Sequence, residues 1–464
     1  MKKLLACAMA VVTFIALNTL PASAVVNETI KVGLRYGSSA MSEANLENDV
    51  GSGYEFGYFD SDRNFVALDW TEEEAITMSP SGYGTIQVTV TGTDRVLYES
   101  DGDTLGVLPT GRDTATWFRG YRYAGGFEYV LSGGSLTVIN VLDLEDYVKG
   151  VVPYEMSSDW PLAALEAQAI CARTYACRDS KHLSTYGFDV CSGSDCQVYH
   201  GLGSSTSYAT DRTDQAVDNT AGLKLYYNGS LVQNAVYHAS DGGATEDAEN
   251  VWGSEVPYLQ GKEDPYEAQT SIPNYTYTVT YTWEELTWVL QNSGYDIGTV
   301  VDAYVSGYTD LGNVDSVTFV DSQGNTLVRT GDNARMAFYS TTLGKNVPSL
   351  RFTITGGTGG GSGYAVNGSG TLLSTLEGVS VISGSGTVGQ LEGETHTAIT
   401  SSGSTVLTGA SSGGQTASAS GITITGTGNG HNVGMSQYGA KAMAELGYTY
   451  RDILEFYYTD ITIE

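Results

Sequence analysis

The chain has 464 residues and carries 22 Lys and Arg against 53 Asp and Glu, which gives a formal net charge of -31. So acidic a chain cannot build the broad positive surface that nucleic acids require, and nucleic acid is excluded as a partner. Other acidic polymers would also be repelled, so any polymer ligand must be held by local hydrogen bonds and ring stacking. The 58 Gly and 32 Tyr, together with many Thr, Ser and Val, predict a chain rich in β-strands.

The N-terminus has the pattern of a secretory signal peptide. Two lysines precede an apolar run, Leu4–Leu17, and Ala22–Ala24 is a small-residue cleavage site. We therefore expect residues 1–24 to be removed, leaving a secreted, extracellular chain that begins near Val25. No later segment is long and apolar enough to cross a membrane, so no membrane span is expected. What remains is longer than one ordinary domain.

Residues 25–131 are expected to form a β-rich N-terminal region, because short alternating segments lie between turn signals such as Asp101-Gly102. This region carries no motif with an evident chemistry. Its aromatic residues could stack on sugars, but aromatic residues at strand spacing belong more often to a core. The residues in question are Tyr54, Tyr58, Phe59, Trp70 and Trp117.

The stretch around Glu155 organises the chain. An alternating segment, residues 136–142, predicts a strand, and an acidic turn follows it. Pro153 favours an extended Val152. Side-chain oxygens at 157–159 can cap a helix, and small and apolar residues then recur at helical spacing up to Cys177. Glu155 therefore lies in a turn immediately before a helix.

Further elements follow in order. A polar helix is expected over 207–220, and Asn228-Gly229 predicts the turn of a hairpin whose second strand runs on to deliver His238. Thr282 and Glu285 form a capping box that starts another helix. Strand-like sequence then covers residues 300–328.

The last third contains a compositional break. Residues 356–421 are rich in Gly, Ser and Thr, yet keep short alternating runs, so we expect a thin β insertion. Similar sequences flank it, Phe-Thr-Ile-Thr at 352 and Ile-Thr-Ile-Thr at 422, as if one strand pair had been cut. Two helices, over 438–446 and 449–457, and a strand over 461–463 are expected to close the chain.

Four motifs, in this order, resemble those of the SpoIID/LytB family of bacterial cell-wall proteins, which contains sporulation lytic transglycosylases and amidase enhancers. They are Val141–Cys177, Asp195–Tyr199, Tyr237–Tyr258 and Gly430–Ala440. The resemblance is weak over the first hundred residues and absent from about 356 to 420. It implies an α+β fold, mostly β with a few packed helices.

The resemblance also implies a division of the chain. Residues 132–355 would form a SpoIID-like catalytic domain that carries a subdomain insertion at about 275–345. The domain would then be interrupted by the insertion over 356–421 and completed by residues 422–464.

In the family, the glutamate at the position of Glu155 is the catalytic acid. A lytic transglycosylase needs only one carboxylate, because the 6-hydroxyl of N-acetylmuramic acid is the nucleophile and a 1,6-anhydro sugar is the product. The apolar neighbours of Glu155 would raise its pKa by desolvation, as this chemistry requires. The nearby rivals occupy turns or caps that water reaches, and they are Asp143, Glu145, Asp146 and Asp159.

Other residues of the matched motifs are expected to orient the sugar or to support Glu155. They are Gln168, Arg173, Tyr175, Gln197, Tyr199, His238, Ser240, Thr245, His431, Ser436 and Gln437. The alternatives are a histidine that bonds the turn backbone at 238, and a simple strand-to-helix turn at 430–437. Asn432 stands where the family has glycine, and asparagine tolerates the left-handed conformation best among the other residues.

Four cysteines follow the leader. Cys171 and Cys177 lie six apart on the predicted helix and should not bridge each other. Cys191 and Cys196 flank a short loop, where a disulfide or free thiols are favoured. Some relatives carry zinc in this loop, and His182 or His200 would then supply an imidazole. The proposed chemistry requires no cofactor.

The expected partners are peptidoglycan glycan strands, and a cell-wall amidase in the alternative that the family offers. In that alternative the protein binds the wall and stimulates an N-acetylmuramoyl-L-alanine amidase without cutting glycan itself. A zinc hydrolase is disfavoured because the chain has no His-Glu-x-x-His motif. A Cys-His nucleophile is disfavoured because the helical cysteines would be buried.

Overall fold

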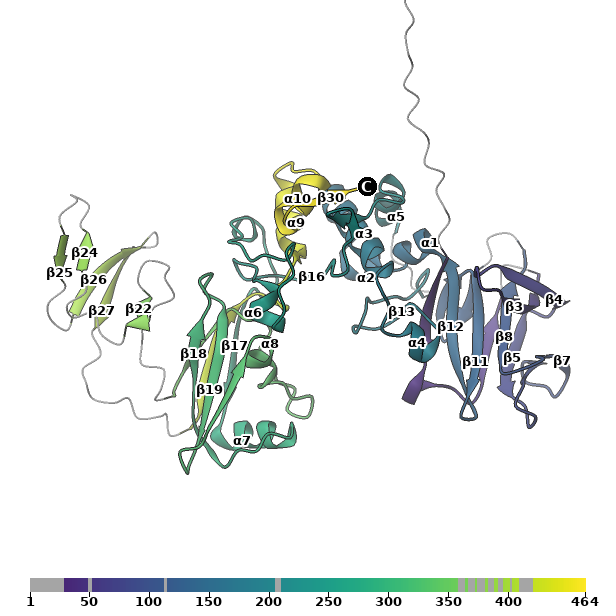
Figure 1. Ribbon diagram of the computed structural model, residues 1–464, viewed down its shortest axis with the longest axis horizontal. Helices are drawn as coiled ribbons and strands as arrows, with labels where there is room; N and C mark the ends of the chain where they lie inside the picture. Colours follow the sequence, from purple (N-terminus) through teal and green to yellow (C-terminus); the bar gives the residue numbers. More distant parts are fainter. Residues whose placement is uncertain are drawn as a thin grey trace, which may run out of the picture.

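The computed structural model describes residues 29–48, 52–111, 115–204, 210–357 and 420–464, and six short strands between 364 and 408. The predicted leader, residues 1–24, and the expected start near Val25 lie outside the described residues. The mixed α+β, mostly β fold predicted from the sequence is observed. Figure 1 shows the parts in a row, with the helices between two β-rich regions.

Two sheets form the N-terminal side of the molecule. The larger sheet has the strand order β13 (Val190–Cys191), β1 (Thr29–Arg35), β12 (Ser135–Asp143), β11 (Gly126–Ser132), β8 (Thr104–Pro109), β3 (Tyr54–Phe59) and β4 (Phe65–Thr71). The second has the order β10 (Tyr121–Ala124), β9 (Ala115–Phe118), β2 (Ala44–Glu47), β5 (Ala75–Pro80), β6 (Ile86–Val90) and β7 (Val96–Glu99). A short 3-10 turn, η1 (Gly37–Ser39), follows β1.

The aromatic residues of this region divide between core and surface. Tyr54 is fully buried, whereas Tyr58 and Trp70 are 45% and 65% exposed. Phe59 packs against Phe65, with the ring centroids 5.2 Å apart. The core interpretation therefore holds for Tyr54 and is wrong for Tyr58 and Trp70.

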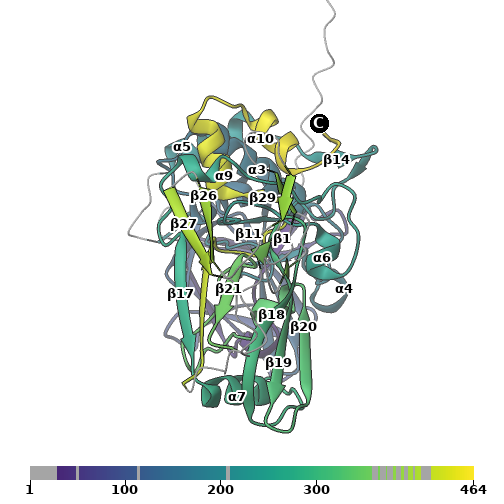
Figure 2. The same ribbon diagram turned by 90° about the vertical axis from the view of Figure 1, so that its left-hand side faces the viewer.

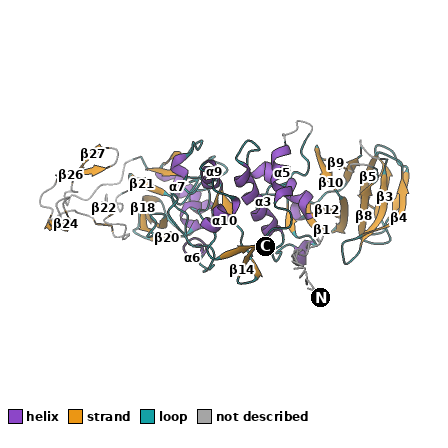
Figure 3. Ribbon diagram, turned by 90° about the horizontal axis from the view of Figure 1, so that it is seen from above, coloured by secondary structure: helices purple, strands orange, loops and turns teal. Residues whose placement is uncertain are grey.

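The middle layer is helical (Figure 3). Its helices are α1 (Leu144–Lys149), α2 (Val152–Glu155), α3 (Leu162–Ala176), α4 (Leu183–Tyr186), α5 (Asp211–Asn219), α9 (Gln437–Glu445) and α10 (Tyr450–Tyr457). Helix α3 is buried almost all round, because its alanines let α1, α5, α9 and α10 pack closely against it. The apolar side chains of both sheets and of these helices form one continuous core.

Three sequence-based predictions for the region near Glu155 differ from the structure. The acidic turn is helix α1, where the Asp143 side chain caps the N-terminus by accepting from the Glu145 N–H. Val152 is helical rather than extended, because α2 forms despite the bias that Pro153 imposes. No side chain caps α3, and Pro161 takes its N-cap position instead.

Two small sheets join segments that are far apart in the chain. The Asn228-Gly229 hairpin forms as predicted from β14 (Leu225–Tyr227) and β15 (Ser230–Leu231), and the final strand β30 (Ile461–Ile463) pairs with β14. The hairpin does not continue to His238. Instead a separate strand, β16 (Tyr237–His238), pairs in parallel with β29 (Met435–Ser436).

A second β-rich region follows the helices and has a core of its own. It contains the sheet β17 (Thr276–Tyr281), β28 (Ile422–Thr427), β21 (Phe352–Thr355) and the sheet β18 (Val300–Tyr308), β19 (Val314–Asp321), β20 (Thr326–Thr330). Its helices are α7 (Trp283–Asn292) and α8 (Asp332–Met336). The short elements α6 (Ala248–Trp252) and η2 (Glu267–Gln269) precede it in the chain, and the buried side chains of α6 belong to the first core. Figure 2 shows β17 to β21 beneath α9 and α10, with α7 at the far end.

The flanks of the compositional break pair as the sequence suggested, because β21 and β28 are antiparallel neighbours. The strands described between them pair two by two, and they are β22 (Tyr364–Ala365), β23 (Leu372–Leu373), β24 (Ser380–Ile382), β25 (Val388–Gln390), β26 (Thr395–Thr400) and β27 (Gly403–Thr408). In the described part of the chain, no helix has the length and hydrophobicity that a bilayer crossing requires.

Candidate functional site

Glu155 is the last residue of α2, which contacts both α1 and α3. Its neighbours Val151, Val152 and Met156 are buried, and its own side chain is half-buried. Removal from water disfavours a charged carboxylate. Burial is accordingly the largest influence on this group and raises the pKa of Glu155 above its usual value.

Three donors oppose this effect and stabilise the ionised form of Glu155. The backbone N–H of Val198 donates to Glu155 Oε1 over 3.0 Å. The side chains of Tyr237 and Gln437 also hydrogen-bond the carboxylate, and all three contacts lower the pKa of Glu155. Glu155 is thus a desolvated carboxyl group with preformed hydrogen bonds to its charged state.

A buried network holds these donors. Tyr237 Oη lies 3.1 Å from Gln197 Oε1, a second acceptor for its proton, and Gln197 Nε2 donates to the Ala172 carbonyl over 3.2 Å. Gln437 Nε2 donates to Gln168 Oε1 over 3.3 Å. The structure therefore brings Gln168, Gln197 and Gln437 together around Glu155.

The tyrosine hydroxyl in this network has a single proton. It can donate to Glu155 or to Gln197, but not to both at once. When Glu155 is ionised, the carboxylate is the stronger acceptor. When Glu155 is protonated, the hydroxyl can return to Gln197, so the network can follow the charge of Glu155 without moving the backbone.

The rival carboxylates have other roles or surroundings. Glu145 forms a bidentate ion pair with Arg173, in which its two carboxylate oxygens lie 2.7 Å from Nε and 2.6 Å from Nη2. Asp143 caps α1, and Asp159 is exposed. Asp146 is half-buried rather than solvated, and burial raises its pKa, with Asp143 adding repulsion.

Several residues expected at the sugar lie inside the protein. Arg173 is completely buried in its pair with Glu145. The Tyr199 hydroxyl donates to Asn140 Oδ1 over 2.7 Å, and Thr245 Oγ1 accepts from the Lys262 N–H over 3.0 Å. In this structure the side chains of all three residues are engaged in contacts within the protein.

Tyr175 lies toward the cysteine loop. The Arg178 guanidinium lies 3.8 Å from the centre of its ring, and its hydroxyl is 3.5 Å from the Asp195 carbonyl. Ser240 and Ser436 both donate to Glu267, over 2.8 and 2.5 Å. Both serines are buried, so their hydroxyl groups are also directed into the protein.

The two histidines of the motifs meet each other rather than Glu155. The ring centroids of His238 and His431 are 5.2 Å apart, and Trp252 lies equally far from His431. His238 Nδ1 is 3.1 Å from the Val433 carbonyl, which fits the structural alternative. Tyr237 and His238 are successive in β16 and so point to opposite faces of the strand.

Both histidines are neutral in these surroundings. Burial, with the neighbouring His431, holds the pKa of His238 well below its usual value. Burial and the nearby Arg335 lower the pKa of His431 to about 4. Neither ring is set up to carry a proton at neutral pH.

Asn432 has φ 65°, the left-handed conformation expected of it. Its side chain is buried and donates to the carbonyls of Asp241 and Ala244, while it accepts from the Leu350 N–H. Asparagine at this position therefore joins three loops that a glycine could not join.

The cysteine loop gathers four possible metal ligands. His182, Cys191, Asp195 and Cys196 place their ligand atoms within 4.8 Å of one another. Cys196 Sγ lies 3.4 Å from His182 Nε2, and its contact with Cys191 contributes most to lowering the pKa of that thiol to about 5. No disulfide joins Cys191 and Cys196, and His200 stacks on Tyr121 instead of joining the cluster. Two thiolates, an imidazole and a carboxylate are a donor set that suits zinc.

Sequence reasoning missed Val198, Tyr237 and the buried acidic side chains behind the site. The N–H of Val198 belongs to the backbone and leaves no trace in side-chain patterns. Tyr237 stands beside His238 in the matched motif, and its strand position could have identified it. Glu267 lies outside every motif, so no sequence signal pointed to it.

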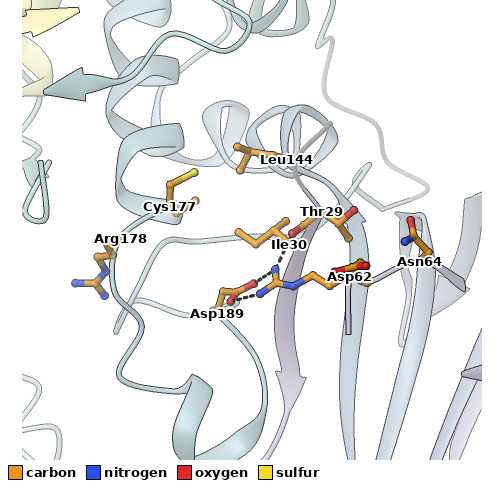
Figure 4. Close-up of a pocket in the computed structure, with 10 residues that line it drawn as sticks. Thr29, Ile30, Asp62, Asn64, Leu144, Cys177, Arg178 and Asp189 are labelled. Carbon is orange, nitrogen blue, oxygen red and sulfur yellow. Dashed lines mark hydrogen bonds and ion pairs between the residues drawn. The ribbon is translucent and has the colours of Figure 1, made fainter. Parts of the chain in front are cut away.

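A pocket of about 410 Å³ lies elsewhere, between the first sheet and the end of α3. Arg63 and Asp189, which both line it, form an ion pair, and Figure 4 shows Cys177 above Asp189. Arg178 belongs to its lining, and its guanidinium points away from that pair. The lining does not include Glu155, so this pocket is separate from the candidate site.

Comparisons with known proteins agree with these motifs. Residues 132–227 match the family model described as Stage II sporulation protein. The amidase enhancer of Bacillus subtilis is 31% identical over 332 residues, which are 68% of this chain and 40% of the relative. Stage II sporulation protein D of Bacillus subtilis is 34% identical over 157 residues, which are 31% of this chain and 44% of the relative.

A third relative is an uncharacterised protein of Brachyspira hyodysenteriae, 34% identical over 254 residues, which are 53% of this chain and 64% of the relative. The chain thus spans less than two thirds of the length of each of these relatives.

Proposed function

This chain belongs to the SpoIID/LytB family, and its similarity to members of that family supports a cell-wall-related function. We propose that it is a peptidoglycan lytic transglycosylase. Glu155 is its general acid and base. The substrate is the glycan strand, cut between N-acetylmuramic acid and N-acetylglucosamine. The observation that carries the proposal is the single desolvated carboxyl group at 155 with its three donors.

The reaction begins with Glu155 protonated. Its proton passes to the glycosidic oxygen as the bond from that oxygen to C1 of the muramic acid breaks. The Glu155 carboxylate left behind is stabilised by the Val198 N–H and by the Tyr237 and Gln437 side chains.

The same carboxylate then takes the proton of the 6-hydroxyl as that oxygen bonds to C1. The product is a 1,6-anhydro end, no water is consumed, and Glu155 is protonated again. A raised pKa keeps Glu155 protonated for the first step and makes its carboxylate a better base in the second, and the donors stabilise the anion that exists between the two steps. One carboxyl group suffices because the nucleophile belongs to the substrate.

The test is incubation of the purified protein with glycan strands, with and without stem peptides, followed by mass spectrometry. Anhydro-ended fragments are the expected product. Fragments with ordinary reducing ends would show hydrolysis and overturn the transglycosylase proposal, as would intact strands under conditions in which the protein is folded.

The similarity to an amidase enhancer favours a second candidate function, stimulation of a cell-wall amidase without glycan cleavage. A substitution at Glu155 distinguishes the two functions, because only glycan cleavage depends on its carboxyl group. If the protein accelerates an amidase and Glu155→Gln does so equally well while neither releases anhydro sugars, the enhancer function holds.

The cysteine loop fits a structural zinc site. Cys191, Cys196, His182 and Asp195 would hold the ion and close its coordination shell. Bound zinc would stabilise the loop that precedes Val198, whose N–H contacts Glu155. The acid and base steps themselves do not pass through the metal.

We also propose that the protein is secreted and cell-wall associated, with residues 1–24 as its signal peptide. The parallel pair β16–β29 and the sheet β17–β28–β21 support one domain assembled from residues 132–355 and 422–464.

A further inference from the structure

Three acidic side chains lie together behind the candidate site. Asp241, Asp264 and Glu267 are 0%, 3% and 2% exposed, and their carboxylate oxygens lie within 4.8 Å of one another. Among the residues that the structure describes, none of the three has a lysine or arginine at ion-pair distance. Three buried negative charges without a cation would repel one another strongly.

The hydrogen bonds identify which of these groups is ionised. Glu267 Oε1 accepts from Ser436 Oγ over 2.5 Å and from the Asp241 N–H over 2.8 Å. Glu267 Oε2 accepts from Ser240 Oγ over 2.8 Å and from the Gly242 N–H over 3.0 Å. All four acceptor positions are filled by donors, as an ionised carboxylate requires.

Asp241 is the member of the cluster whose surroundings most favour a protonated carboxyl group. Asp264 accepts from the Tyr457 hydroxyl over 2.6 Å and from the Tyr266 and Glu267 N–H groups. Asp241 Oδ2 is buried and has no hydrogen-bond partner among the described residues, while burial and the charge of Glu267 raise the pKa of Asp241 well above its usual value. A protonated Asp241 that shares its proton with Asp264 leaves Glu267 free to stay ionised.

Glu267 therefore ties two strand ends together. Ser240 lies two residues after β16, and Ser436 ends β29 and caps α9 through the Gly439 N–H, over 3.0 Å. Both serine hydroxyl groups reach Glu267. Tyr237 belongs to β16, and Gln437 directly follows β29 as the first residue of α9; these are the two side chains that hydrogen-bond Glu155.

We propose that Glu267 is a positioning residue, whose carboxylate clamps β16 to β29 and thereby holds Tyr237 and Gln437 against Glu155. Its effect on the rate rests on the proposed function, whereas its effect on the environment of Glu155 does not. Without the clamp the two donors loosen while the burial of Glu155 persists.

The test compares Glu267→Gln with a matched control, Glu246→Gln. Glu246 is equally buried, at 2%, and also accepts four hydrogen bonds. Its side-chain donors come from Asn250, Thr309 and Asn313, none of which belongs to β16 or β29. In both variants the NH2 group of the new glutamine would face an N–H or O–H donor where a carboxylate oxygen had accepted a hydrogen bond. Both variants should therefore lose stability by similar amounts.

The decisive readout is the titration of Glu155, followed by NMR of carboxyl-labelled glutamate and assigned by the signal missing in Glu155→Gln. In Glu267→Gln the midpoint should move up by about one pH unit, a tenfold change in the proton affinity, because two donors to the anion are weakened. In Glu246→Gln the midpoint of the Glu155 titration should not change. Anhydro-sugar release should fall roughly tenfold in the first variant and be unchanged in the second at a temperature where both are folded.

Ser240→Ala provides a milder variant should Glu267→Gln fail to fold. It removes one hydroxyl of the clamp and should shift the Glu155 midpoint in the same direction by a smaller amount. An unchanged midpoint in these variants, or an equal shift in Glu246→Gln, overturns the proposal. If the wild type releases no anhydro sugar and the midpoint still shifts, the transglycosylase function fails and the positioning role stands.

Discussion

The backbone N–H of Val198 donates to Glu155 Oε1 over 3.0 Å, although the two residues lie 43 positions apart. Val198 stands two residues after Cys196, and Glu155 ends the short helix α2. The contact joins the cysteine loop to the candidate catalytic group. The donor belongs to the backbone, so among substitutions at 198 only proline, which has no N–H, removes it.

Glu155→Gln should abolish the release of anhydro sugars while the protein stays folded. The amide keeps the shape of the side chain but cannot transfer a proton. Mass spectrometry of digested glycan strands measures the product. Glu166→Gln, on the partly exposed side of α3 where Glu166 accepts from Asn219, is the matched control and should remain active. Activity in Glu155→Gln would assign the proton transfers to another group.

Tyr237→Phe should raise the pKa of Glu155 further and slow the reaction by roughly tenfold, because the anion loses one hydroxyl donor. The pH dependence of product release measures the change, and its limb due to Glu155 should move to higher pH. Tyr277→Phe is the control, since that half-buried hydroxyl bonds Ser349 instead. Equal effects in both variants would show a loss of stability rather than a local role.

Asp241→Asn should make the protein less sensitive to alkaline pH. The folded-state pKa of Asp241 is raised above its unfolded value, so its contribution to stability is complete below the unfolded pKa and is lost as the pH rises through the folded one. Asparagine reproduces the protonated state and has no proton to lose.

Urea unfolding at pH 5 and pH 8 provides the measurement for Asp241. The free energy of unfolding of the wild type should fall more between these pH values than that of Asp241→Asn, by roughly 1 kcal/mol or more. A parallel fall in the two proteins would contradict the assignment of the buried proton to Asp241.

Cys196→Ser should remove the capacity of the loop to bind zinc. The wild type is expected to bind about one zinc ion per chain, because a thiolate pair with an imidazole and a carboxylate completes a tetrahedral shell. Metal analysis after dialysis measures the content. Cys177→Ser changes a cysteine outside the cluster and should keep the zinc, and a wild type without zinc would end the proposal.

Arg173→Ala should destabilise the protein by about 3–5 kcal/mol, because it leaves the carboxylate of Glu145 without its buried partner. Chemical denaturation measures the loss. Arg95→Ala breaks the exposed pair with Glu73 and should cost no more than about 1 kcal/mol. Comparable losses would show that the burial of Arg173 contributes little to stability.

The sequence by itself determined the elements that depend on short-range chemistry. Thr282 and Glu285 form their capping box, Asn228-Gly229 turns its hairpin, and Asn432 takes the left-handed conformation. Each outcome depends on residues within a few positions of one another, so it could be predicted locally. The apolar neighbours of Glu155 likewise predicted its desolvation, since the burial of adjacent side chains follows from their composition.

Only the tertiary structure decided what faces Glu155. The histidines at 238 and 431 were expected to orient the sugar or to support Glu155; strand alternation directs Tyr237 toward Glu155, and the two histidines contact each other. Parallel pairing of β16 with β29 sets that orientation, and nearly 200 residues separate the two strands. Such pairing depends on long-range packing and not on local propensity. For the same reason, the clamp formed by Glu267 could not be predicted from the sequence and is evident only in the tertiary structure.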